Sequence, residues 1–517
     1  MASSMILLAV VLAVIAIVNA QGSSHQIGFG VQRLRKAHAK NIHHLGGLKA
    51  ATTCPDVEQY WYTDAVVDNF APADKIQKWA NNGQRYWLNK KFWAGANAPI
   101  FVFIGGEGEE SCSRLGPKMY VYDLAQKHSA LMVNVEHRFY GESMPTDNRS
   151  TENLSVLSSD QALADLANVI QHVKKELNSP HSRVITVGGS YPGNLSAYFR
   201  LKYPSVTHGS IASSAPVTAQ TNFKEYMDVV GESIRYFSGS DCYDALKDGA
   251  DAIAKLAAGG PGSDGMKTLE KDFGTCTPIA SNLDLGVFYS NVMGNLQGTV
   301  QYNNEHAGTW NVTDVCQVMA PGSEVSPAPS AYDKLVRLTD IFEKQAGATC
   351  QDVSYEATVA YLADIKPDPS NAARPWVYQT CNEFGYYQTA DSPNQPFYAF
   401  KDALDLEFSR KMCFDAFDGW SSDPNVKFTN EKYGGVHLDA TRIVFTSGTI
   451  DPWHALGVTN YTHTLPQYPS ELPVYILGTA HCNDLYAPNA STDPESLTQA
   501  REIVAKEVDK WLQTDSA

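Results

Sequence analysis

The sequence predicts an α/β fold in which a parallel sheet is covered by helices on both faces and a helical segment is inserted into it. In the first half of the chain, short apolar runs alternate with amphipathic helical segments, and the same alternation returns near the end. The stretch between them has helical patterns and six of the nine cysteines, but no comparable series of strands.

Three strands and one helix are expected in the first half. Residues 98–106 (APIFVFIGG), 130–141 (ALMVNVEHRFYG) and 183–189 (RVITVGG) are continuous apolar runs, as expected for strands buried on both faces of a parallel sheet. The helix before the third strand opens at Ser158, where a serine followed three residues later by Gln161 resembles a capping box. It stops before Pro180.

Two further strands and a final helix are expected near the C-terminus, at 441–448 (TRIVFTSG), at 472–478 (LPVYILG) and after Asp493-Pro494. The apolar residues that this helix turns inward are Leu497, Val504, Val508 and Trp511. We therefore predict an α/β domain in two parts, 51–217 and 438–517, separated by a helical cap domain at 218–437 that carries its own disulfides.

The composition limits the classes of partner. A chain of 517 residues with a net charge of −16 lacks the basic face that nucleic acids and anionic membranes require, so neither is expected as a partner. None of the nine cysteines forms a CxxC pair, which favours disulfides over structural zinc. We expect no metal and no cofactor. The oligomeric state stays open, with a homodimer as the alternative to a monomer.

The N-terminus indicates export. The only long apolar run, residues 5–18, is too short to span a bilayer and is followed by small residues, so we read 1–20 as a signal peptide and 21–50 as a tail or propeptide. This predicts a secreted or lysosomal/vacuolar protein. An odd number of cysteines leaves at least one thiol unpaired. Glycosylation is expected at Asn148, Asn153, Asn311, Asn460 and Asn489, whereas a sixth sequon, Asn194, should be buried and bare.

Three residues follow strands in the order expected of a serine hydrolase. Ser190 ends the 183–189 strand, Asp451 follows the 441–448 strand, and His481 follows the 472–478 strand. In α/β-hydrolases the nucleophile, acid and base appear in this order, each at the C-terminal end of a strand. The histidine takes the serine proton during attack, and the carboxylate orients the histidine. His454, His463 and Asp484 are the alternative candidates for the base and the acid.

The segment around Ser190, GGSYPG, departs from the usual Gly-x-Ser-x-Gly because Pro192 stands where the second glycine is expected. Proline at 191 would remove an N–H donor of the oxyanion hole, which we assign to Tyr191 and to Gly106 in the glycine-rich loop 105–108. Proline at 192 instead falls in the first turn of the following helix, where its missing N–H has no intrahelical partner. The altered motif is therefore compatible with catalysis.

Several segments resemble one family of serine peptidases. They are GGSYPGNLSAYFRLKYP, GSIASSAPV, GGEGEESC, VEHRFYGESMP, DQALADLANVI and SGTIDPWHALG, which together resemble the family of lysosomal Pro-X carboxypeptidase, dipeptidyl peptidase II and thymus-specific serine protease. NFKEYMDVV and TCNEFGYYQTADSPNQPF are most similar to the thymus-specific branch. The resemblance implies an α/β-hydrolase with a helical cap and places the triad on the same three residues.

Two positions depart from that family. Many relatives have a doubled histidine at the last triad position, where this chain has AHCNDLY, and the family's Asp-His-Phe near the N-terminus appears as Asp68-Asn69-Phe70. Neither change removes a catalytic group. We expect Cys482, beside His481, to form a disulfide, because it is poorly placed to serve as a nucleophile.

The predicted function is that of a serine-type exopeptidase, of carboxypeptidase or dipeptidyl peptidase type, which hydrolyses short peptides near one terminus. The resemblance implies proline as the first residue to test beside the scissile bond. Two alternatives stay open: an esterase or lipase on the same scaffold, and a non-catalytic secreted binding protein.

Overall fold

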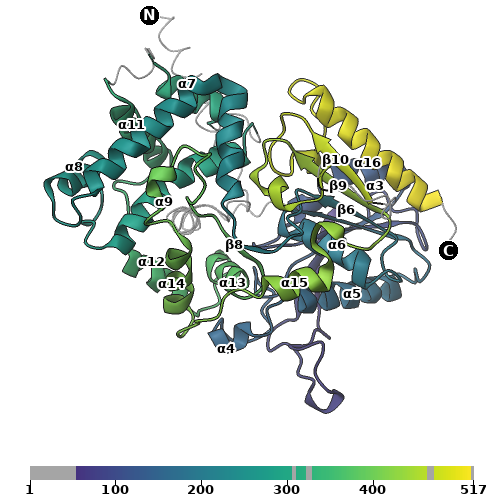
Figure 1. The fold of residues 1–517 in the computed structure, drawn as a ribbon. Helices are drawn as coiled ribbons and strands as arrows, with labels where there is room; N and C mark the ends of the chain where they lie inside the picture. The colour runs from purple at the N-terminus through teal and green to yellow at the C-terminus, as the bar shows by residue number, and fades with distance from the viewer. Residues whose placement is uncertain (1–53, 305–309, 322–328, 461, 463–470, 514–517) are drawn as a thin grey trace, which may run out of the picture.

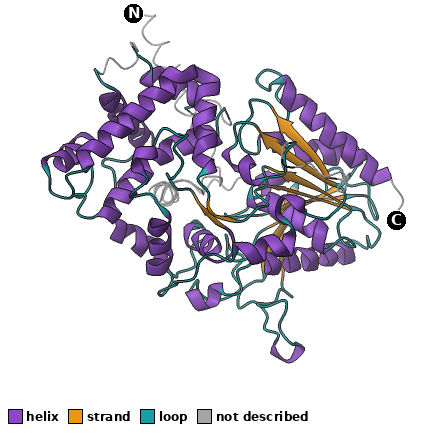
Figure 2. Ribbon diagram, in the orientation of Figure 1, coloured by secondary structure: helices purple, strands orange, loops and turns teal. Residues whose placement is uncertain are grey.

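The computed structural model describes residues 54–304, 310–321, 329–460, 462 and 471–513. Its elements form a helix-covered sheet and, beside it, a group of helices that comes from the middle of the chain (Figures 1 and 2). The predicted signal peptide and tail at 1–20 and 21–50 lie outside the described residues.

The large sheet has eight strands in the order β1-β2-β4-β3-β5-β6-β9-β10. Their bounds are β1 (Val57–Tyr62), β2 (Gln84–Asn89), β3 (Ile100–Ile104), β4 (Leu131–Val135), β5 (Val184–Gly189), β6 (Gly209–Ser213), β9 (Ile443–Gly448) and β10 (Glu471–Ile476). The pairs β1–β2 and β2–β4 are antiparallel, and every pair from β4 to β10 is parallel. The carboxyl ends of β5, β9 and β10 therefore lie along one edge.

Helices cover both faces of the sheet. Successive side chains of a strand point to opposite faces, so each strand contributes to two cores. Phe101 and Phe103 of β3 pack in a core with α3 (Tyr120–His128) and α16 (Glu495–Gln513). Ile100, Val102 and Ile104 of the same strand belong to the core that includes α5 (Ser159–Glu176) and α6 (Tyr191–Lys202). This is the predicted α/β-hydrolase fold, confirmed.

The chain between β6 and β9 is mostly helical. It contains α7 (Glu225–Ala257), α8 (Asp264–Asp272), α9 (Asn282–Gln301), α10 (Val312–Met319), α11 (Ala331–Gln345), α12 (Tyr355–Ala363), α13 (Ala373–Gln379), α14 (Leu406–Ala416) and α15 (Val426–Tyr433). A short parallel pair, β7 (Gln220–Asn222) and β8 (Gly385–Tyr387), joins the start of this segment to its later part. We call the segment the helical insert; its bounds at 218 and 437 stay a prediction.

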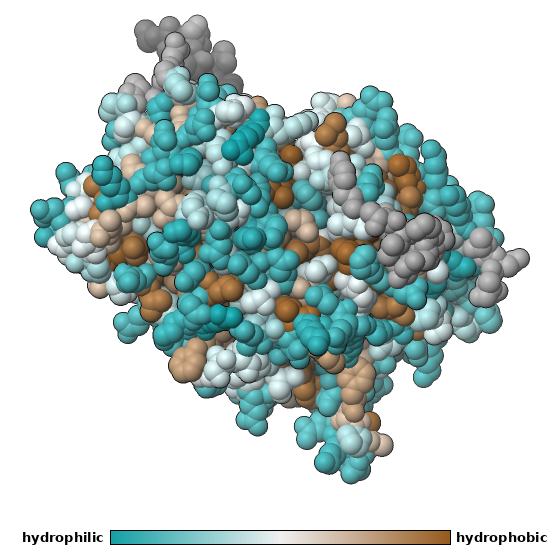
Figure 3. All heavy atoms as spheres, in the orientation of Figure 1, coloured by the Kyte–Doolittle hydropathy of each residue, from teal (hydrophilic) through white to brown (hydrophobic). Residues whose placement is uncertain are grey.

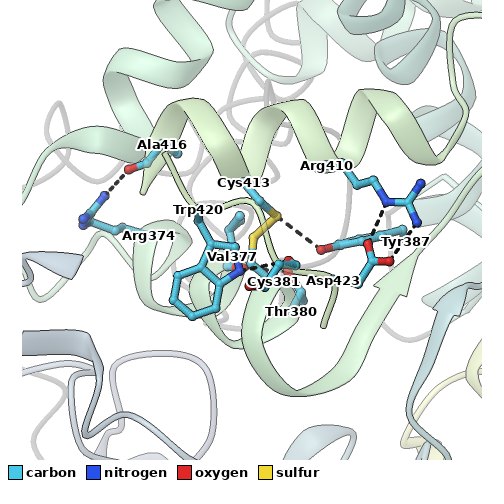
Figure 4. The surroundings of a disulfide bond; sticks show 11 residues. Arg374, Val377, Thr380, Cys381, Tyr387, Arg410, Cys413, Ala416, Trp420 and Asp423 are labelled. Atoms are coloured by element: carbon cyan, nitrogen blue, oxygen red, sulfur yellow. Dashed lines mark hydrogen bonds and ion pairs between the residues drawn. A yellow bond between two sulfur atoms is a disulfide. The ribbon is translucent and has the colours of Figure 1, made fainter. Parts of the chain in front are cut away.

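Four disulfides are formed. Three of them, Cys242–Cys316, Cys276–Cys350 and Cys381–Cys413, lie within the helical insert, and Cys54–Cys112 joins β1 to the loop after β3. The Cys381–Cys413 bridge fastens α14 to the turn that precedes β8, and the Tyr387 hydroxyl lies 3.2 Å from Cys413 Sγ (Figure 4). Cys482 is a free thiol, so the expectation that it forms a disulfide is wrong.

Two sequence expectations about local structure need correction. The strand expected at 130–141 ends already at Val135, and the polar residues after it leave the sheet. At Ser158 only half of the capping box forms: the Ser158 hydroxyl accepts the Gln161 N–H, but the Gln161 side chain bonds to Asp68 and Asn69 instead of returning to the helix end.

The helical insert is fastened to the sheet domain at the start of α5. Glu383, in the turn between α13 and β8, accepts the backbone N–H of Ser159 at 3.0 Å and the Ser159 hydroxyl at 2.8 Å. Beside it, Lys432 of α15 pairs with Asp160. Burial raises the pKa of Glu383 to about 7. The Glu383 carboxylate at the N-terminus of α5 thus holds the two parts together, although its burial disfavours the ionised form.

This buried carboxyl predicts a pH dependence of stability. Between about pH 4.5 and pH 7 the folded protein holds a proton on Glu383 that the unfolded chain has released, so the free energy of unfolding should fall as pH rises. Glu383→Gln should remove this pH-dependent part of the free energy of unfolding, which is on the order of 1–3 kcal/mol. The melting temperature of the variant should therefore exceed that of the parent by more at pH 8 than at pH 5. Thermal unfolding at both pH values measures the difference.

Glu431→Gln is the control, because Glu431 is exposed on the neighbouring helix α15. It should leave the pH dependence unchanged. Parallel melting-temperature profiles for Glu383→Gln and the parent would contradict the assignment.

Candidate active site

Ser190 lies on a sharp turn between β5 and α6. Its backbone has φ 65° and ψ −134°, a conformation that residues other than glycine rarely adopt. The Ser190 N–H donates to the Ser213 carbonyl of β6 at 2.9 Å, which ties the turn to the next strand. The side chain is half-buried and lines a cavity at the strand ends.

Two glycines make room for this turn. A Cβ atom on Gly188 would lie 2.0 Å from the Pro192 carbonyl oxygen, and one on Gly193 would lie 2.7 Å from the Ser213 carbonyl oxygen. Backbone atoms cannot move aside as a flexible side chain can. Gly193 therefore provides the close contact with β6, one position later than the usual motif would place its second glycine.

Pro192 occupies the first turn of α6 and packs against the loop after β3. The space that a Cβ on Gly106 would occupy is filled by the proline ring, whose Cγ would be 2.3 Å away. The two positions are thus complementary: a glycine at 106 accommodates the proline at 192.

Asp451 and His481 are brought together at the ends of β9 and β10. His481 Nδ1 lies 2.9 Å from Asp451 Oδ1, and both side chains are buried. The same carboxylate oxygen caps the short helix 452–456 by accepting the Trp453 N–H at 3.0 Å. Burial disfavours the imidazolium, but the charges and hydrogen bonds of Asp451 and Cys482 together outweigh burial and raise the pKa of His481 well above 6.5.

The helical insert supports both of these residues through the end of α9. The Gln301 carbonyl accepts the His481 N–H at 3.0 Å, and the Gln301 side chain accepts the Trp453 indole N–H at 2.8 Å. Tyr302, the next residue, places its ring edge-on to the His481 ring and lines the same cavity as Ser190. Sequence reasoning missed Gln301, because nothing in a helical pattern marks one glutamine as a contact.

The two N–H groups assigned to an oxyanion hole are not used elsewhere. The Gly105 N–H donates to the Val135 carbonyl within the sheet at 2.8 Å, so it is occupied. In the part of the chain that the structure describes, the N–H groups of Gly106 and Tyr191 donate no hydrogen bond. Gly106 lines the cavity together with Ser190 and His481.

The Tyr191 side chain is held by a chain of buried polar groups. His137 Nε2 and the Gln379 amide each lie 2.9 Å from the Tyr191 hydroxyl, and Tyr140 donates to Gln379 at 2.6 Å. Burial lowers the pKa of His137 to about 3, so its ring is neutral, and its Nδ1 lies 2.7 Å from the Arg138 carbonyl. Nδ1 is then the donor, and Nε2 accepts the Tyr191 proton. Gln379 lies on α13, so the helical insert also contacts the residue after Ser190.

The alternative acid and base occupy other positions. Asp484 accepts the hydroxyls of Ser213 at 2.6 Å and Thr446 at 2.7 Å, a structural role between strands. His454 Nε2 lies 3.0 Å from the Tyr475 hydroxyl. His463 lies outside the described residues.

The sequons differ in exposure. Asn194 is fully buried and donates to the Pro216 carbonyl and the Tyr386 hydroxyl, as expected of a residue on the helix after Ser190. Asn460 and Asn489 are exposed, and Asn148, Asn153 and Asn311 are half-buried. Glycosylation at these five positions stays a prediction.

Within the described ranges, no helix is long and apolar enough to cross a membrane. Figure 3 shows polar residues over most of one face, with hydrophobic residues in small separate patches.

Comparisons with known proteins show what the chain is similar to. A family model described as serine carboxypeptidase S28 matches residues 65–504. The chain is 31% identical over 502 residues to the human thymus-specific serine protease, covering 94% of this chain and 92% of that protein. It is 30% identical over 447 residues to the human lysosomal Pro-X carboxypeptidase, covering 83% and 84%. A solved proline iminopeptidase from Mycobacterium smegmatis superposes with a TM-score of 0.38 at 12% identity, covering 84% and 97%.

The contact between Gly106 and Pro192 predicts a pair of coupled substitutions. Gly106→Ala should displace the loop or the elbow and lower kcat/KM by about 10²-fold, the typical effect of losing one oxyanion donor. Pro192→Gly alone should stay within about tenfold of the parent, and adding it to Gly106→Ala should recover at least about tenfold, because the clash is with the proline ring alone. Steady-state kinetics of the four proteins measure the coupling. A folded double variant no more active than Gly106→Ala would contradict the account.

Proposed function

The chain belongs to the serine carboxypeptidase S28 family and is a serine peptidase, and from this premise we propose that Ser190, His481 and Asp451 are its nucleophile, base and acid. The observation that carries the proposal is the hydrogen bond between Asp451 and His481 beside a cavity that Ser190 also lines. The three residues follow three parallel strands, which end at the same edge of the sheet.

In the proposed reaction, Ser190 Oγ attacks the peptide carbonyl while His481 Nε2 takes its proton. Asp451 Oδ1 accepts Nδ1–H throughout, which fixes the tautomer and stabilises the imidazolium. The oxyanion of the tetrahedral intermediate is bound by the N–H groups of Gly106 and Tyr191. His481 then gives the proton to the leaving amine, and water hydrolyses the acyl-enzyme by the same steps in reverse.

The substrates we propose are short peptides that enter beneath the helical insert. Gln301 and Tyr302 belong to the insert, and both contact His481. The insert therefore lies over the reacting groups, which supports the exclusion of folded proteins from the site. Cleavage beside proline and residence in a lysosome or outside the cell are proposed from the relatives, one of which is a lysosomal Pro-X carboxypeptidase.

Removing the nucleophile or the base tests the catalytic assignment. Ser190→Ala and His481→Ala should each lower kcat by about 10⁴-fold or more, and the double variant should be little worse, because the residues act as a unit. Ser190→Ala should also lose labelling by a fluorophosphonate probe, whereas Cys482→Ala should keep it. Labelling of Ser190→Ala at another serine, or turnover above about a tenth of the parent, would refute the assignment.

Blocking one peptide end tests the substrate class. A proline-containing peptide is offered free, N-acetylated and C-amidated, beside a folded protein and an ester of similar size. We expect one blocked form to be cleaved at least about tenfold more slowly than the free peptide and the folded protein to survive, since a cap that closes one end of the site binds that terminus. Mass spectrometry of the products identifies the bond. Equal cleavage of all three forms would indicate an open endopeptidase site.

A further inference from the structure

Glu107 is a carboxylate in the catalytic cavity that the proposed reaction does not use. It follows Gly106 in the loop after β3 and lines the same cavity as Ser190 and His481. Its side chain is half-buried, and it forms no ion pair within the described part of the chain. A partly desolvated carboxylate without a cation is costly unless a ligand provides one.

The other charged groups of the cavity wall have partners of their own, and His481 is paired with Asp451. Glu110 lies 3.4 Å from Arg114 and also accepts the Asn134 amide at 3.0 Å. Outside the cavity lining, Arg85 pairs with Glu136 at 2.6 Å. The remaining wall near Glu107 is apolar and includes Phe103, Met119 and Leu485. Glu107 therefore gives this cavity an uncompensated negative charge in low-dielectric surroundings.

His481 lines this cavity, so we place the leaving group of the proposed reaction here. His481 must donate its proton to the leaving amine, so the first residue of the leaving group passes beside the imidazole. Cys482, Leu485 and Tyr486, which follow His481 in the chain, form part of the cavity wall. A side chain on that first residue would reach the space that Glu107 faces.

We propose that Glu107 selects peptides with a positively charged group beside the scissile bond. The proposal rests on Ser190 and His481 as the reacting pair. The cation is either the side chain of the first leaving residue, which the position beside His481 favours, or the peptide's α-amino group. Glu107 acts by binding positive charge, so it is a specificity residue and takes no part in proton transfer.

The selection should depend on pH. Burial raises the pKa of Glu107 to about 7. The hydrogen bond from its own N–H and the charge of His481 lower this pKa, and to smaller extents Glu110 raises it and Arg114 lowers it. Above that pKa the carboxylate is ionised and attracts cations, and below it the charge is lost. The preference should thus be larger at pH 8 than at pH 5.

The test uses the full-length protein and two peptides that differ only in arginine or citrulline as the first leaving residue, each free and N-acetylated. Arginine stays charged across this pH range, and citrulline is its neutral counterpart. At pH 8 the parent should cleave the arginine peptide at least about tenfold faster in kcat/KM, and the ratio should fall at pH 5. If instead the free amine is preferred tenfold over the acetylated form, the α-amino group is the cation, and the proposal also stands.

In Glu107→Gln, the kcat/KM ratio that shows the preference in the parent should fall to within about twofold of one. Glu109→Gln is the control, because Glu109 is an exposed neighbour, and it should keep the ratio of the parent. Ratios near one for both peptide pairs in the parent, or an unchanged preference in Glu107→Gln, would overturn the proposal. Either result leaves labelling of Ser190 and cleavage of the citrulline peptide intact, so it is distinct from failure of the proposed catalytic function.

Discussion

The left-handed backbone at Ser190 is the constraint around which the end of the sheet is built. A residue with a Cβ at φ 65° is strained and persists only where its surroundings fix it. Here the Ser190 N–H donates to the Ser213 carbonyl, and the backbone packs so closely at Gly188 and Gly193 that no side chain would fit there. The sharp turn places Ser190 in the lining of the cavity and leaves the Tyr191 N–H, the first of α6, without an acceptor in the described part of the chain.

The helical insert has a second role besides covering this edge. Its helix α9 ends at Gln301, which binds the backbone of His481 and the indole of Trp453, two residues after Asp451. Its helix α13 ends at Gln379, which binds the hydroxyl of Tyr191. The insert therefore contacts His481 itself, Tyr191 next to Ser190, and Trp453 near Asp451. A shift of the insert would alter the geometry of the base and of the oxyanion donor together.

The sequence predicts the elements that depend on local pattern. Apolar runs locate β3, β5 and β9 because strands buried on both faces are mostly apolar, and a similar run locates β10, a half-buried strand at the edge of the sheet. It does not reveal β1, β2 or β6. In β2 and β6, polar residues such as Arg85 and Ser210 are buried and bonded to partners far away in the chain.

The same limit applies to the site. Ser190, Asp451 and His481 can be assigned from chain order and strand ends, whereas Gln301, Gln379 and the unpaired Glu107 act through contacts with distant residues. Cys482 shows the converse error: an even pairing of cysteines is a chemical expectation, but which sulfur stays free depends on where each one lies in space. The contact that accommodates the Pro192 ring is with Gly106, in the loop after β3, and the sequence does not reveal it.

The most direct test of this account is the crystal structure of the protein after reaction with a peptidyl phosphonate, whose phosphoryl oxygen stands in for the oxyanion. The account predicts phosphorus bonded to Ser190 Oγ, with that oxygen about 2.7–3.1 Å from the nitrogens of Gly106 and Tyr191. His481 should remain bonded to Asp451. A phosphoryl oxygen directed to solvent, or an adduct on a residue other than Ser190, would contradict it.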